Sequence, residues 1–155
     1  MYRLVFFALV SIVSSLGYAH HWVHEVYDGE KRFIADVEVK KFSLINPHPL
    51  MSIEIKNIHG DNTVDGAEVG QTWVLEMDNR RELTDLGFNP DTFIPGDQIT
   101  VAVDPSFDTS YRKNTMYIRA IEHSRQGFIY IHNVRELFPV DSDGNGLVLH
   151  FQKAR

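Results

Sequence analysis

Apolar and polar residues alternate along most of this chain, which is the pattern of half-buried β-strands. In the segment 33–40, phenylalanine, alanine and valine side chains share one face, while Asp36, Glu38 and Lys40 share the other. Five later segments show the same alternation or a short run of β-branched and aromatic residues. We therefore expect strands at residues 33–40, 51–56, 73–77, 99–103, 116–120 and 128–131.

Turn-forming residues separate these segments. Asn46-Pro47-His48-Pro49 predicts a corner, because proline fixes its own φ and restricts the residue before it. Pro95-Gly96-Asp97 is a second turn signal, ahead of the fourth strand. Only residues 82–86, followed by Gly87, fit one or two helical turns. Five or six short strands with one short helix between the third and fourth predict an all-β fold, a small closed OB-like barrel, with an open antiparallel sandwich as the alternative.

The first residues carry the pattern of an export signal. Arg3 supplies a positive charge, residues 4–13 form a short apolar run, and Gly17 and Ala19 are small residues where a signal peptidase reads. We expect cleavage after Ala19. A retained membrane anchor is the weaker alternative, because the apolar run is about half as long as a bilayer requires.

Cleavage divides the chain into three predicted parts: a signal peptide at 1–19, the barrel domain at 20–140, and a C-terminal turn with a strand or tail at 141–155. The mature protein is then periplasmic or secreted, without a stable membrane span. Removing Arg3 moves the net charge from -6 to about -7, and lysine and arginine are scattered, so nucleic acid is not an expected partner. The chain has no cysteine, so a metal must bind to nitrogen or oxygen.

Histidines at the new N-terminus are the candidate metal ligands. A terminal His20 can chelate a metal through its amine and its imidazole together, and His21 and His24 complete the motif H-H-x-x-H. His48 lies at the predicted corner. The amine and ring of His20 with the ring of His48 would place three nitrogens in a T shape, a histidine brace, which suits copper(II). The four histidines therefore predict a site for copper or another divalent ion.

Two other interpretations account for the same histidines. His21 at the second mature position can bind copper with the terminal amine and the intervening amide nitrogen, which needs no folded site. Alternatively, the N-terminal histidines are exposed on a frayed end, and His48 caps the proline corner through a backbone hydrogen bond. The sequence leaves all three interpretations open.

Several short motifs together resemble a known family. In order along the chain they are His20-His21, Asn46-Pro47-His48, Trp73 with Glu76, Leu86-Gly87, and Pro95-Gly96-Asp97 before Ile99 and Val101. In this order, the chain resembles a family of small exported bacterial proteins defined only as a domain of unknown function. The resemblance covers most of the mature chain and implies a periplasmic, OB-like β-barrel without an established activity. His24 and the acidic segment 141–146 have no match in that pattern, so their roles rest on chemistry alone.

The acidic segment 141–146 matches the first half of an EF-hand calcium loop. The twelfth position is Gln152 rather than glutamate, and no helix pattern brackets the loop. An ordinary turn explains the same residues, so calcium binding is not expected.

Other side chains suggest weaker possibilities. Aromatic residues can form a platform for a sugar or another flat ligand, although Trp73 is better explained as core. The carboxylates of Glu76, Asp85 and Asp97 have no defined partner, and surface or turn roles are expected for them. The aromatic candidates are Trp22, Tyr27, Trp73, Tyr111, Tyr117 and Tyr130.

Three functions follow from these patterns. The first is a binding protein that holds copper or a similar ion for storage, delivery or sensing. The second is a metal-free barrel that binds a ligand or a periplasmic protein partner. The third is a copper-dependent redox enzyme. The sequence contains no G-x-S-x-G, P-loop or H-E-x-x-H motif, so no hydrolase is supported and a protein without catalytic activity is favoured.

Overall fold

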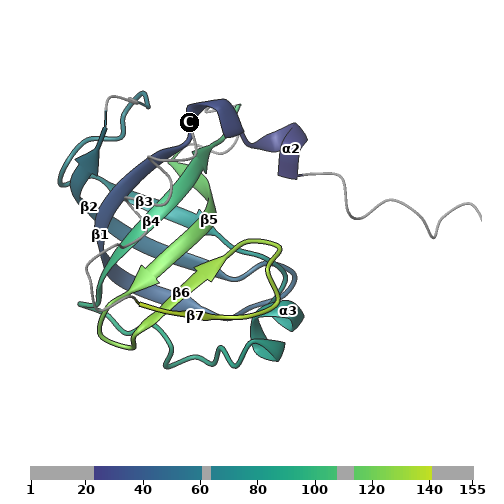
Figure 1. The fold of residues 1–155 in the computed structure, drawn as a ribbon. Coiled ribbons are helices and arrows are strands. Elements are labelled where there is room, and N and C mark those ends of the chain that lie inside the picture. Colours follow the sequence, from purple (N-terminus) through teal and green to yellow (C-terminus); the bar gives the residue numbers. More distant parts are fainter. Residues whose placement is uncertain (1–22, 61–63, 108–113, 141–155) are drawn as a thin grey trace, which may run out of the picture.

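Strands dominate the computed structural model, which describes residues 23–60, 64–107 and 114–140 (Figure 1). Each of the six predicted strands is present, and most are longer than the alternating pattern indicated. The strands are β1 Phe33–Ser43, β2 Leu50–His59, β3 Thr72–Glu76, β4 Gln98–Pro105, β5 Thr115–His123, β6 Phe128–Ile131 and a short β7 Phe138–Pro139.

The strand pairing closes a barrel. β1 lies between β2 and β4, β2 pairs with β3, and β4 pairs with β5, all antiparallel. Parallel pairing of Val74–Glu76 with Thr115–Tyr117 then joins β3 to β5 and completes a ring of five strands. β6 and β7 extend the sheet from the second half of β5. The predicted all-β, OB-like barrel is confirmed, and the open sandwich is excluded because β3 and β5 pair.

The alternating pattern decides which side chains fill the barrel. Val37, Val39, Ile53 and Ile55 are at most 1% exposed and belong to one continuous core, while the residues between them on β1 and β2 face outward. Trp73 lies in the same core at 3% exposed, as predicted. Burying apolar faces against one another in this way supplies the main driving force for the fold.

The predicted helix is α3 Arg80–Asp85, between β3 and β4. The Asn79 side chain caps its N-terminus by accepting a hydrogen bond from the Glu82 N–H, and Gly87 follows the last turn with φ +93°. The structure adds one helical turn, α2 Val23–Val26, and one 3-10 turn, η1 Gly29–Lys31. Within the described ranges, no helix is long and apolar enough to cross a membrane.

A buried ion cluster attaches the start of the described chain to the barrel. Asp104 on β4 is fully buried and accepts hydrogen bonds from Arg32, before β1, and from Arg119 on β5. The backbone N–H of Asp28 also donates to the Pro105 carbonyl at 2.8 Å. These contacts hold residues 27–32 against the ends of β4 and β5.

Candidate functional site

The corner at His48 joins β1 to β2, and its Asn46–Pro47 peptide is cis. The His48 ring is partly exposed, and its Nδ1 lies 3.1 Å from the backbone carbonyl oxygen of Met77. A carbonyl oxygen only accepts, so Nδ1 is the nitrogen that carries the proton and donates. The other ring nitrogen, Nε2, then keeps the lone pair that a metal ion requires.

Glu76, at the end of β3, links this corner to the segment that precedes β1. Its Oε1 lies 3.9 Å from the Nδ1 of His48, and its Oε2 accepts a hydrogen bond of 2.6 Å from the Tyr27 hydroxyl. Tyr27 is buried and directly follows α2, whose backbone includes His24. Glu76 therefore has defined partners, which the sequence did not indicate.

The structure describes only part of the predicted metal site. The backbone of His24 lies in α2, whereas His20 and His21 lie outside the described residues, as does the acidic segment 141–146. Across residues 23–60, 64–107 and 114–140, no group of three or more histidine or carboxylate side chains is placed to hold a metal ion. A copper site that uses the N-terminal histidines stays a prediction.

Asp78 is a buried carboxylate held by three side chains from distant parts of the chain. The Tyr117 hydroxyl donates to its Oδ1 at 2.7 Å, the Tyr130 hydroxyl donates to its Oδ2 at 2.5 Å, and the Nδ1 of His132 lies 2.8 Å from Oδ1. The β3–β5 pairing sets Glu76 beside Tyr117, and the β5–β6 hairpin adds Tyr130. Closure of the barrel therefore assembles this cluster.

The electrostatics of the cluster fix its protonation. Burial alone would raise the pKa of Asp78, but hydrogen bonds from His132, Tyr130 and Tyr117 and the charge of His132 lower it to about 2. Burial raises the pKa of both tyrosines, and the Asp78 charge raises it further, so both phenols stay protonated. Asp78 is thus ionised at neutral pH, and its phenol partners act as donors.

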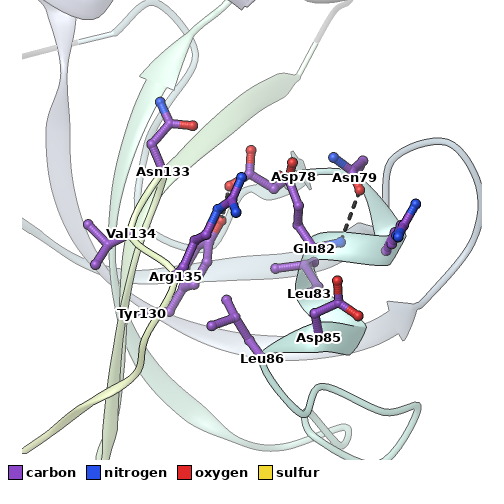
Figure 2. A pocket seen from close by; sticks show the side chains of 11 residues that line it. Asp78, Asn79, Glu82, Leu83, Asp85, Leu86, Tyr130, Asn133, Val134 and Arg135 are labelled. Atoms are coloured by element: carbon purple, nitrogen blue, oxygen red, sulfur yellow. Dashed lines mark hydrogen bonds between the residues drawn. The ribbon is translucent and has the colours of Figure 1, made fainter.

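A pocket of about 540 Å³ opens beside Asp78 (Figure 2). One wall comes from α3, and the opposite wall comes from Tyr130 and the residues that follow β6. Leu83, Leu86 and Val134 contribute apolar surface to it. We call this cavity the Asp78 pocket.

Comparison with known proteins identifies the family of the chain. A model of the family of unknown function DUF6152 matches residues 8–114, which is more than half of the chain. The chain belongs to DUF6152. This result agrees with the resemblance to a family that has no established activity. No curated protein and no solved structure matches the chain.

The DUF6152 match ends at a structural boundary. It includes His48, Glu76 and Asp78, together with the predicted N-terminal ligands. β5 begins at Thr115, directly after the matched residues. The strand that closes the barrel, and the three side chains that hold Asp78, therefore lie beyond the part of this DUF6152 protein that the family model covers.

The outer face of β1 and β2 carries a ladder of charged pairs. Lys40 and Lys56 each contact both Glu38 and Glu54, at nitrogen–oxygen distances between 2.6 and 3.0 Å. Hydrogen bonds from Lys40 and Lys56 lower the pKa of Glu38 to about 2. Because the charges on this face are paired with one another, the ladder explains these residues without a ligand.

The aromatic candidates form no platform where the structure describes them. A platform needs exposed rings, and each of the described candidates is at most 3% exposed. Trp22 and Tyr111 lie outside the described residues. The buried aromatic candidates are Tyr27, Trp73, Tyr117 and Tyr130.

Sequence reasoning missed the central residues of the Asp78 cluster. Asp78 belongs to no motif, and its only signal is a polar residue directly after an alternating strand. His132 likewise follows β6 without a pattern around it. Asp97 keeps its expected turn role but also accepts two hydrogen bonds from Arg125 and contacts His123 at 3.1 Å.

Proposed function

We propose that this DUF6152 protein is an exported binding protein that holds copper or another divalent ion at its mature N-terminus. The amine and ring of His20 and the ring of His48 would form the brace. His21 and His24 are further candidate ligands. The observation that carries the proposal is the hydrogen bond from the His48 Nδ1 to the Met77 carbonyl, which leaves Nε2 as the coordinating nitrogen.

The position of Tyr27, the first residue after α2, supports the proposal. Tyr27 and His48 both contact the Glu76 carboxylate. Six residues lie between His20 and Tyr27. Three extended residues and the four residues of α2 together span roughly 16 Å, which is the length available for the terminal amine to approach His48.

The first experiment determines the N-terminus of the protein recovered from its host. Intact mass and N-terminal sequencing should show that the mature chain begins at His20. Retention of residues 1–19 would remove the chelating amine and with it the brace.

The second experiment is a copper titration of the mature protein and three variants. His48→Ala and an added residue before His20 should each weaken copper binding by about tenfold or more, because each removes a ligand from the site. His59→Ala is the matched control, since His59, at the end of β2, is paired with Asp36 on β1 and lies outside the proposed site. Equal affinity for the His48→Ala domain and for a peptide of the first mature residues would instead identify a flexible His21 site.

Two other functions remain as proposals. A metal-free barrel that binds a ligand or a periplasmic protein would show no metal affinity beyond that of the free peptide. A copper-dependent redox enzyme would bind copper and also oxidise a reductant such as ascorbate under turnover conditions. Measuring both properties on the copper-loaded protein separates the three functions.

A further inference from the structure

The Asp78 pocket has the dimensions of a small-molecule site. Its volume of about 540 Å³ lies within the range of roughly 300 to 1,000 Å³ that is typical of ligand pockets. Its two walls come from residues 78–86 and 130–135, which the closed barrel brings together. The pocket is separate from the proposed copper ligands, so it requires its own explanation.

The walls offer a nonpolar surface to part of a ligand. Leu83 is fully buried, and Leu86 and Val134 are half-buried along the pocket. Tyr130 also lines the pocket, but it is only 1% exposed, and its hydroxyl is turned to Asp78. A short aliphatic or aromatic body would bury its own surface against these side chains.

The fixed charge at the pocket is negative. Hydrogen bonds from two phenols and an imidazole hold the Asp78 carboxylate in place. A carboxylate has about four lone-pair sites, so three donors leave it capacity to accept once more. Glu82 and Arg135 also line the pocket. Both are exposed residues with long side chains, and Figure 2 shows both side chains extending toward Asp78. Across the lining, the carboxylates of Asp78, Glu82 and Asp85 outnumber the guanidinium groups of Arg81 and Arg135.

We propose that the Asp78 pocket binds a small organic cation, a primary ammonium group on a short apolar or aromatic body. The ammonium group would lie between the Asp78 and Glu82 carboxylates and form an ion pair with each. The apolar body would lie against Leu86 and Val134. Arg135 would turn toward solvent, as its exposure permits.

The test uses 2-phenylethylamine as the probe, with 2-phenylethanol and 3-phenylpropionate as neutral and anionic counterparts. The full mature protein, treated with a chelator so that metal binding plays no part, is titrated and followed by amide NMR shifts. We expect the amine to bind at least about tenfold more tightly than either counterpart, with shifts confined to residues 78–86 and 130–135. Tighter binding of the anion, or amine shifts elsewhere on the barrel, would overturn the proposal.

Variants make the test specific to the pocket. Glu82→Gln should weaken amine binding about threefold to fivefold, as expected for loss of one exposed ion pair. Glu68→Gln, on an exposed turn, is the matched control and should leave the affinity unchanged. Leu86→Lys places a competing ammonium at the pocket wall and should abolish binding while the NMR spectrum stays folded. Wild-type affinity in both Glu82→Gln and Leu86→Lys would contradict the assignment.

Discussion

Asp78 shows how strongly one side chain can depend on distant partners. Its three donors lie 39 to 54 residues away in sequence, and they reach it only because β5 and β6 pair in the observed register. Together they hold its pKa well below the ordinary value despite its burial. The difference between the folded and unfolded pKa is a contribution to stability that depends on pH.

The first prediction concerns this pH dependence. The folded pKa of Asp78 is about 2, against 3.8 for the ordinary group, so the unfolded state binds more protons between these values. Stability should therefore fall by about 2 kcal/mol as the pH drops from 4 to 2. The free energy of unfolding can be measured by urea titration at each pH. For Asp78→Asn, its dependence on pH between 4 and 2 should lack this fall.

Single residues were the least predictable level of this molecule. His48 was identified because proline on both sides marks a corner, and the backbone hydrogen bond expected by the alternative, metal-free interpretation is present, with Met77 as the acceptor. Glu76 and Asp78 could not be recognised, because their partners depend on strand register rather than on neighbouring sequence. A carboxylate at the end of a strand looks the same whether it faces water or a tyrosine.

Whole elements were predicted more reliably, because period-two alternation is a local property. β1 to β6 lie where the pattern indicated, and α3 begins two residues before its predicted range. The pattern missed α2 and β7, which are only 4 and 2 residues long. Elements of that length contain less than two periods, so no periodicity can reveal them.

The second prediction concerns the cap of α3. The Asn79 side chain accepts a hydrogen bond of 3.0 Å from the Glu82 N–H, which would otherwise lack a helical partner. Asn79→Ala should lower the free energy of unfolding by about 1 kcal/mol, measured by urea titration, while Asn79→Asp keeps the acceptor and should change it by only a few tenths. An unchanged midpoint for Asn79→Ala would mean that burial of Leu83 alone holds the helix.

The third prediction concerns the Pro-Gly-Asp turn that precedes β4. Gly96 has φ +93°, and a Cβ at this position would meet no atom within 4 Å, so the cost of a side chain is purely conformational. Gly96→Ala should destabilise the fold by about 1 to 2 kcal/mol. Gly29→Ala is the control, because its Cβ would make an ordinary contact at 3.5 Å with Asp104 and Gly29 has no positive φ. Equal melting temperatures for the two variants would contradict the strain argument.

At the scale of the whole molecule, the order of elements was sufficient to predict the architecture. Short strands with one helix between the third and fourth favoured an OB-like barrel, and the pairing of β3 with β5 confirms it. The attachment of residues 27–32 through Asp104 was not predictable, because it joins side chains about 70 residues apart. The chemistry of a ligand could not be predicted from the order of elements either, since the fold alone does not determine function.

The fourth prediction follows from closure. Every strand of the ring has two neighbours, so its backbone amides should become exposed to exchange only when the whole barrel unfolds. β7 pairs through only two residues, and the Val140 N–H donates to the Gly127 carbonyl beside it. Native-state hydrogen exchange should show a shared free energy for β1 to β5 and at least about tenfold faster exchange at Val140. Fast exchange at Val74, which donates to the Asn114 carbonyl, would argue against a cooperative ring.

The late position of β5 also affects the chain while it is being synthesised. β1 is the first strand in the sequence, but β4 and β5 complete its surroundings only from Gln98 and Thr115 onward. A nascent chain that emerges N-terminus first therefore exposes two unpaired strand edges until β5 has been made. The buried carboxylate of Asp104, the partner of Arg32, is also made only with β4. The domain is accordingly expected to fold in one late step rather than gradually. A nascent chain halted before β5 would keep unpaired strand edges, which are prone to pair with other molecules.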